Sequence, residues 1–117
     1  MIKEFNLGGK ALTLSANAGT PVRYKMTFAG DLLKDISSKE SATEELPDTV
    51  SQLTYIMNKQ ALGETSDLSF ENYLEWLEQI EDPTVFLTHS VDIITFYLQN
   101  VKTGSKVKNP KGPRNAK

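Results

Sequence analysis

His89 is the only histidine of the chain, and it is the first side chain to consider for chemistry. A metal site needs several ligands at matched spacing, and a serine nucleophile needs a base that a further group orients. The chain has no cysteine, and the acidic residue nearest to His89 is Asp92, at a spacing that suits a local ion pair as well as catalysis. We therefore interpret His89 as a surface or partly buried residue, and we expect no metal, no cofactor and no catalytic residue.

A group of carboxylates is the second candidate for chemistry. At helical spacing most of them lie opposite the aromatic side chains of the same segment, which is typical of a solvated helix face rather than of an acid–base pair. The Gly8-Gly9 pair lacks the lysine and the helix start of a phosphate-binding loop. The sequence therefore indicates a protein that is not an enzyme. The carboxylates are Glu71, Glu75, Glu78, Glu81 and Asp82.

Length and composition favour a single domain. A chain of 117 residues is long enough for a modest core of its own. The absence of cysteine favours an intracellular protein. No apolar run approaches the ~18 residues that a membrane span needs, and the start of the chain lacks the apolar core of a signal peptide. We expect a soluble protein of the cytoplasm with no membrane partner.

Charge is divided unevenly along the chain. Residues 1–101 carry all 15 acidic side chains and seven basic ones, a net charge of −8, whereas the rest of the chain is basic and has no acid. This tail contains proline, glycine and few large apolar side chains, so we predict that residues 104–117 are disordered. It has no aromatic side chain to stack on bases and the body repels phosphate, which makes nucleic-acid binding a minor alternative. The basic residues are Lys102, Lys106, Lys108, Lys111, Arg114 and Lys117.

Residues 20–36 predict the helix around which the rest of the chain is organised. They begin with Thr-Pro, a good helix start, and continue with helical spacing of apolar residues. Gly30 interrupts this pattern and suggests a kink, a close contact or a helix end. Residues 22–28 also alternate as a half-buried strand would, so a strand is the alternative. The predicted apolar face contains Val22, Met26, Ala29, Leu33 and Ile36, widened by Tyr24, Phe28 and Leu32.

The remaining elements follow from turn and cap signals. Alternating segments on either side of Gly8-Gly9 predict a β-hairpin over residues 2–7 and 10–15. Three more helices are predicted. The fold class is therefore mainly α: a short N-terminal β-hairpin followed by about four helices, with one domain over residues 1–103 and a disordered basic C-terminal tail. The three helices cover residues 48–62, 70–80 and 82 to about 104.

Three segments of the chain together have the order and spacing of one known family. The first is RYKMTFAGDLLKDI at residues 23–36, an aromatic-rich helix with a central phenylalanine, glycine and aspartate. The others are LTYIMNKQAL at residues 53–62 and SFENYLEWLEQI at residues 69–80. This pattern, which spans about residues 10–82, resembles the tail assembly chaperones of siphophages and related prophages of Gram-positive bacteria. Ala29 is a departure, since the family often places phenylalanine directly beside glycine.

The resemblance implies a helical, self-associating protein of the bacterial host's cytoplasm. It implies that the chain binds and solubilises the tape measure protein during long-tail morphogenesis, helps to recruit the major tail protein, and is absent from the mature virion. The alternative is a small phage-encoded adaptor or regulatory protein. We expect an apolar groove between residues 20–36 and 70–80. The candidate contact residues are Tyr24, Phe28, Asp31, Leu32, Tyr55, Met57, Phe70, Tyr73, Trp76 and Leu77.

The resemblance also implies a longer form of the protein. In many such phages this form arises by programmed ribosomal frameshifting near the end of the gene. Codons for Pro110-Lys111-Gly112 are compatible with a slippery sequence, so the chain permits such a form. In that case the tail acts as a flexible linker toward the part that recruits the major tail protein.

Overall fold

The computed structural model of the protein describes residues 1–38 and 46–108, without the side chains of residues 38, 46, 47 and 100–108. The possible frameshift site and the six basic side chains of the predicted tail therefore lie outside the described part. The fold is mainly helical with an N-terminal hairpin, so the predicted fold class is confirmed. Its elements are β1 (Ile2–Leu7), β2 (Lys10–Ser15), α1 (Thr20–Phe28), α2 (Leu32–Ser38), α3 (Leu46–Leu62), α4 (Phe70–Leu77), α5 (Val85–Thr88) and α6 (Ser90–Lys108).

The hairpin has the bounds that the sequence predicted. Both central glycines have positive φ, 65° at Gly8 and 88° at Gly9, as a tight two-residue turn between twisted strands requires. The strands pair in register from Ile2 with Ser15 to Leu7 with Lys10. One face of the hairpin is buried, and β2 lies against α3. The buried side chains are Phe5, Leu7, Leu12 and Leu14.

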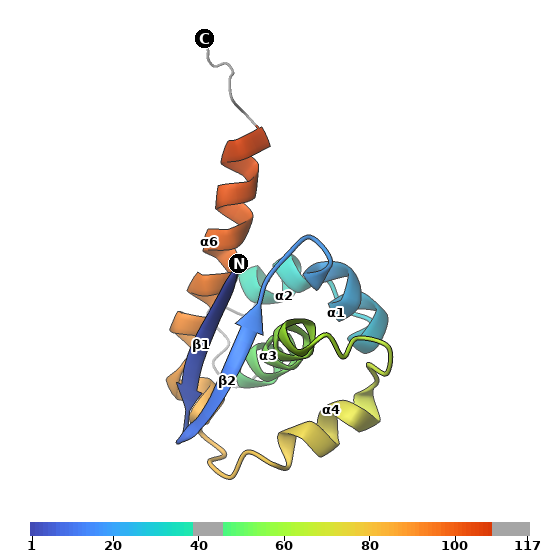
Figure 1. The fold of residues 1–117 in the computed structure, drawn as a ribbon, viewed down its shortest axis with the longest axis vertical. Helices are drawn as coiled ribbons and strands as arrows, with labels where there is room; N and C mark the ends of the chain where they lie inside the picture. The colour runs from blue at the N-terminus through green and yellow to red at the C-terminus, as the bar shows by residue number, and fades with distance from the viewer. Residues whose placement is uncertain (39–45, 109–117) are drawn as a thin grey trace.

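Helix α3 is the central element of the domain. It contacts β2 and every other helix of the described chain, and most of its side chains from Thr49 to Asn58 are buried. Figure 1 shows α3 near the centre, with the hairpin and α6 on one side and α1, α2 and α4 on the other. The predicted helix over residues 48–62 is confirmed, and Gly63 follows it with a φ of 72°. The core is therefore built around α3.

The predicted organising helix is divided into α1 and α2. A helix at residues 22–28 is confirmed, and the strand alternative is wrong. The division comes at Ala29, which has a φ of 58° and donates its N–H to the Lys25 carbonyl. A Cβ on Gly30 would lie 2.7 Å from Asp35 Oδ2 and 3.1 Å from the Tyr24 ring. Gly30 therefore lies in the link between the two helices and in close contact with a side chain of each.

The predicted apolar face of this region is wrong in part. Val22, Met26 and Leu33 are exposed, whereas Tyr24 and Leu32 are buried. Both sets fit the helical period, so periodicity alone does not separate them. The aromatic face is covered instead because large rings bury more apolar surface than valine or methionine does.

The last two predicted helices have different ends from those expected. Ser69 Oγ accepts a hydrogen bond from the Asn72 N–H and caps α4, which ends at Leu77 rather than at residue 80. The following helix is divided into α5 and α6. Helix α6 continues to Lys108, beyond the end that the sequence predicted near residue 104. One glycine costs only about 1 kcal/mol in a helix that is already nucleated.

Candidate interaction surfaces

The groove that the sequence predicted is filled by the chain's own aromatic side chains. Phe28 of α1 lies 5.1 Å from Tyr73 of α4, measured between ring centroids. Tyr55 of α3 lies 5.4 Å from Trp76 and 5.6 Å from Tyr73. These edge-to-face contacts join α1, α3 and α4 into one cluster. The faces that were predicted to receive a partner therefore pack against each other.

The polar ends of these aromatic residues also have partners within the chain. The Tyr24 hydroxyl donates to Asp35 Oδ2 at 2.9 Å, and burial together with this carboxylate raises the pKa of Tyr24. The Tyr73 hydroxyl lies 2.6 Å from Ser51 Oγ. Burial raises the pKa of Tyr73 as well. These bonds identify the tyrosines as core residues.

The ten candidate contact residues thus divide into a buried and an accessible set. Phe28 and Leu77 are half-buried, Phe70 is 53% exposed, and Asp31 is exposed. Asp31 Oδ1 accepts a hydrogen bond from the Lys34 N–H and caps α2, which gives it a structural role. A partner could reach the buried set only by displacing the chain's own side chains. That set is Tyr24, Leu32, Tyr55, Met57, Tyr73 and Trp76.

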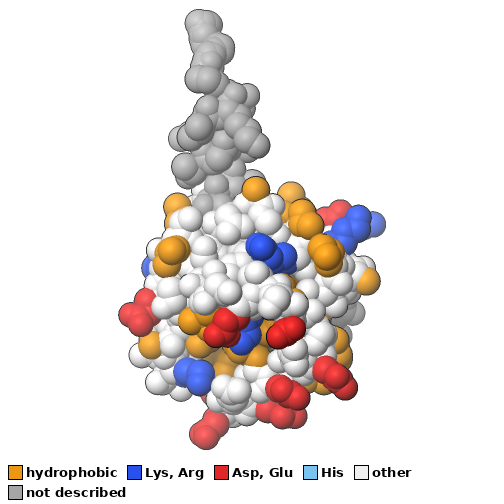
Figure 2. All heavy atoms as spheres, turned by 45° about the vertical axis from the view of Figure 1, so that its right-hand side comes forward, with side chains coloured by type: hydrophobic (Ala, Val, Ile, Leu, Met, Phe, Trp, Pro, Cys, Tyr) orange, Lys and Arg blue, Asp and Glu red, His pale blue; other side chains and the backbone are white. Residues whose placement is uncertain are grey.

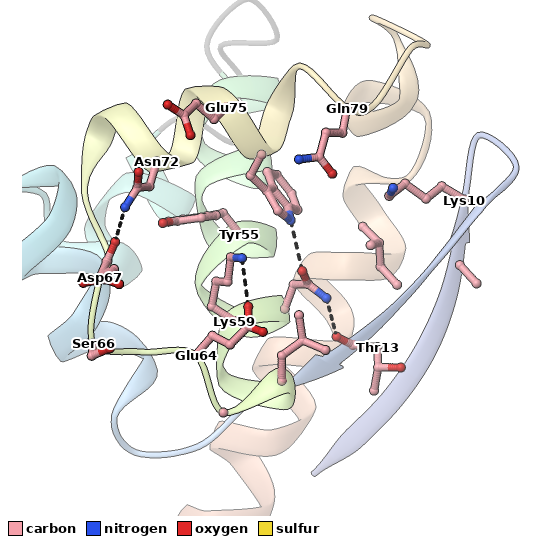
Figure 3. Close-up of a pocket in the computed structure, with 16 residues that line it drawn as sticks. Lys10, Thr13, Tyr55, Lys59, Glu64, Ser66, Asp67, Asn72, Glu75 and Gln79 are labelled. Carbon is pink, nitrogen blue, oxygen red and sulfur yellow. Dashed lines mark hydrogen bonds and ion pairs between the residues drawn. The ribbon is translucent and has the colours of Figure 1, made fainter.

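A hollow of about 720 Å³ lies between β2, α3 and α4. Figure 3 shows its side chains, with Glu75 on α4, Gln79 just after α4 and the Lys59–Glu64 ion pair at the end of α3. The Lys59 Nζ–Glu64 Oε1 distance is 3.2 Å. Lys10 reaches toward it from β2. The lining mixes both charges with amides, so it favours no single ligand chemistry. Within the described residues, no three His, Cys, Asp or Glu side chains are placed to hold a metal ion.

Two amide side chains of α3 join the hairpin to the helices. Asn58 Nδ2 donates to the Thr13 carbonyl at 3.0 Å, while its Oδ1 accepts from Trp76 Nε1 at 3.0 Å. Gln60 Nε2 donates to the Ser15 carbonyl at 2.6 Å. These bonds satisfy carbonyls on the edge of β2 that faces away from β1. Neither amide was among the predicted site residues, although two amides within the apolar stretch LTYIMNKQAL indicate buried polar contacts.

One open surface lies along α1, and we call it the α1 groove. Val22 and Met26, one turn apart, are 56% and 80% exposed, and Leu68 lines the same groove. Figure 2 shows exposed hydrophobic side chains over the upper part of this face, where α1 and α2 lie, and acidic ones over the lower part. The groove has a volume of about 520 Å³. It is lined by Gly19, Val22, Arg23, Met26, Thr27, Thr65, Ser66 and Leu68.

A second open surface lies between α4, α5 and the start of α3, and we call it the acidic groove. Its volume is about 410 Å³ and its floor is mostly apolar, whereas every charged residue that lines it is acidic. Hydrogen bonds from the Thr84 N–H and hydroxyl lower the pKa of Asp82, so this carboxylate stays ionised. The floor contains Leu74, Leu77, Ile80, Pro83 and Phe86, and the rim contains Asp48, Glu78, Glu81 and Asp82.

His89 lies at the C-terminal end of α5 and is half-buried, as the sequence predicted. It lines a hollow of about 440 Å³ together with Glu4 and Asp92. Among the described helices, none is long and apolar enough to cross a membrane. Comparison of the chain with protein-family models, with curated proteins and with solved structures found no match.

Proposed function

We propose that this protein is a tail assembly chaperone that binds the tape measure protein in the cytoplasm of the bacterial host. It keeps that protein soluble and helps to recruit the major tail protein during long-tail morphogenesis. The observation that carries the proposal is the α1 groove. The helix that resembles the family most closely leaves an apolar face open to solvent, although its aromatic face is already buried.

The chemistry of the α1 groove suits an apolar helix of a client. Val22, Met26 and Leu68 line the groove and offer apolar contacts. Methionine has a flexible, polarisable side chain, so one surface of this kind adapts to several client sequences. A helix laid in a groove makes its contacts through residues three and four apart, which matches the one-turn spacing of Val22 and Met26.

Charge supports the same mechanism. Helix α1 contains Arg23 and Lys25 and no acidic residue, so its surface does not repel an acidic client. Arg23 Nη1 donates to Gln60 Oε1 at 2.9 Å, which holds this side chain at the wall of the groove. Residues 1–101 as a whole carry a net charge of −8, and like-charge repulsion between loaded chaperones opposes their aggregation.

The proposal moves the client contact from the aromatic cluster to the α1 groove. Trp76 is buried and its indole N–H is bonded to Asn58, so Trp76→Asp is expected to unfold the protein and does not test client binding. The informative variant is Val22→Asp/Met26→Asp, because both side chains are exposed and neither belongs to the buried core.

The test is co-expression with the tape measure protein, measuring the soluble fraction of that client. Wild type is expected to keep it soluble, and Val22→Asp/Met26→Asp is expected to leave it in the pellet. The matched control is Leu87→Asp/Val91→Asp, which changes two exposed apolar residues outside the α1 groove. Circular dichroism checks that both variants are folded. Equal client solubility with the groove variant and the control rules out the groove, and an insoluble client with wild type rules out the chaperone function.

A further inference from the structure

We propose that the basic C-terminal segment of one copy, residues 108–117, binds in the acidic groove of a second copy. This goes beyond the proposed function, since it concerns a different groove and a contact between identical chains. The first argument is charge. All four charged residues that line the acidic groove are carboxylates, and the chain from Lys102 onward has six basic residues and no acid.

The second argument is the spacing of residues in the segment KNPKGPRNAK. Pro110 and Pro113 are three residues apart, and Lys108, Lys111, Arg114 and Lys117 are also spaced by three. A polyproline II helix has three residues per turn, so it would place the prolines on one edge and the basic residues on another. Such a segment suits a groove with an apolar floor and an acidic rim. It also loses little conformational entropy on binding, because proline limits the unbound chain.

The length of α6 decides whether the segment can bind in the groove of its own chain or only in that of a second copy. Phe86 lines the acidic groove four residues before the start of α6, and α6 then runs away from the body for 19 residues, about 27 Å. An extended chain advances at most ~3.5 Å per residue, so Lys111 and Arg114 reach no more than about 11 Å and 21 Å beyond Lys108. Only Lys117, which reaches about 32 Å beyond Lys108, spans the length of α6, so Lys111 and Arg114 cannot lie in the groove of their own chain. The length of α6 does not restrict access of the segment to the groove of another copy.

A contact of this kind joins two different surfaces, the tail of one copy and the groove of the next. Each copy then retains one free tail and one free groove, so assembly continues until a ring closes or a filament forms. The association depends on charge and therefore weakens as salt screens the carboxylates.

The test begins with a labelled peptide of residues 108–117, whose binding to the full chain is followed by fluorescence anisotropy. Glu78→Lys/Glu81→Lys is expected to weaken binding about tenfold or more, because two attractive contacts become repulsive. The matched control, Glu71→Lys/Glu75→Lys, makes the same charge change on exposed residues of α4 outside the acidic groove. A second control is a peptide of the same composition without the three-residue spacing. Equal binding to both double variants, or of both peptides, overturns the proposal.

A charge-swap experiment tests the contact between copies. Light scattering measures the mass of the groove-reversed chain, Glu78→Lys/Glu81→Lys, and of the tail-reversed chain, Lys111→Glu/Arg114→Glu/Lys117→Glu. Each is expected to be monomeric alone, and a mixture is expected to form complexes because the three new glutamates of the tail meet the two new lysines of the groove. A mixture that stays monomeric, or single variants that assemble as wild type does, overturns the proposal. Neither result bears on client binding at the α1 groove.

Discussion

Replacing Asn58 with alanine is expected to lower the free energy of unfolding by about 3 kcal/mol. The Asn58 side chain is 4% exposed and links three elements through two hydrogen bonds, to the Thr13 carbonyl in β2 and to the Trp76 indole in α4. Each bond contributes about 1 kcal/mol, and leaving the buried indole N–H without an acceptor adds about 1 kcal/mol or more. In a domain of this size the loss corresponds to a fall in melting temperature of about 12–24 °C.

The assay is urea unfolding followed by the fluorescence of Trp76, the only tryptophan, and by circular dichroism. Gln79→Ala is the matched control, because Gln79 lines the same hollow but is exposed. It is expected to change stability by less than about 0.5 kcal/mol. A double-mutant cycle with Trp76→Phe isolates the indole bond and should give a coupling energy of about 1 kcal/mol.

The hollow beside Asn58 is open, so water is able to enter and bond the groups that the variant leaves free. A loss of less than about 1 kcal/mol, close to that of the Gln79 control, would refute the view that this amide is essential for joining the hairpin to the helices.

Two further predictions concern Gly30 and the buried tyrosines. Gly30→Ala is expected to lower the free energy of unfolding by about 1–2 kcal/mol, because the new methyl group displaces the Asp35 carboxylate from the Tyr24 hydroxyl. Denaturant unfolding of the double variant with Tyr24→Phe should show a loss smaller than the sum of the two single losses. A fully additive loss would mean that the methyl group acts elsewhere. Burial raises the pKa values of Tyr24, Tyr55, Tyr73 and Tyr97, so the folded protein holds their protons more tightly than the unfolded chain does. The stability that these protons contribute is therefore fully present below about pH 10, the usual tyrosine pKa, and is lost as the pH rises above it. Thermal unfolding between about pH 8 and 11 measures this loss, and a melting temperature that does not change over this range would contradict the prediction.

Local chemistry made the elements of this fold predictable. The Gly8-Gly9 turn, the Ser69 cap and the stop at Gly63 each act within a few residues, and each is found where the sequence placed it. Helix ends were less predictable where they depend on contacts between distant residues. Gly30 is an example, since the space that requires a glycine is defined by Tyr24 and Asp35 once α2 packs back on α1.

The choice of buried face required the tertiary structure. A helical pattern shows that Val22 and Met26 share one face and that Tyr24 and Phe28 share another, but both faces are apolar. Only the packing of α4 and α3 against α1 decides that the aromatic face is covered and the Val22–Met26 face is left open. The sequence by itself determined the hairpin and the approximate places of the helices, because those preferences are local, and it left a strand open only for residues 22–28. The tertiary structure decided which apolar residues form the core and which remain for a partner, because burial depends on what the rest of the chain covers.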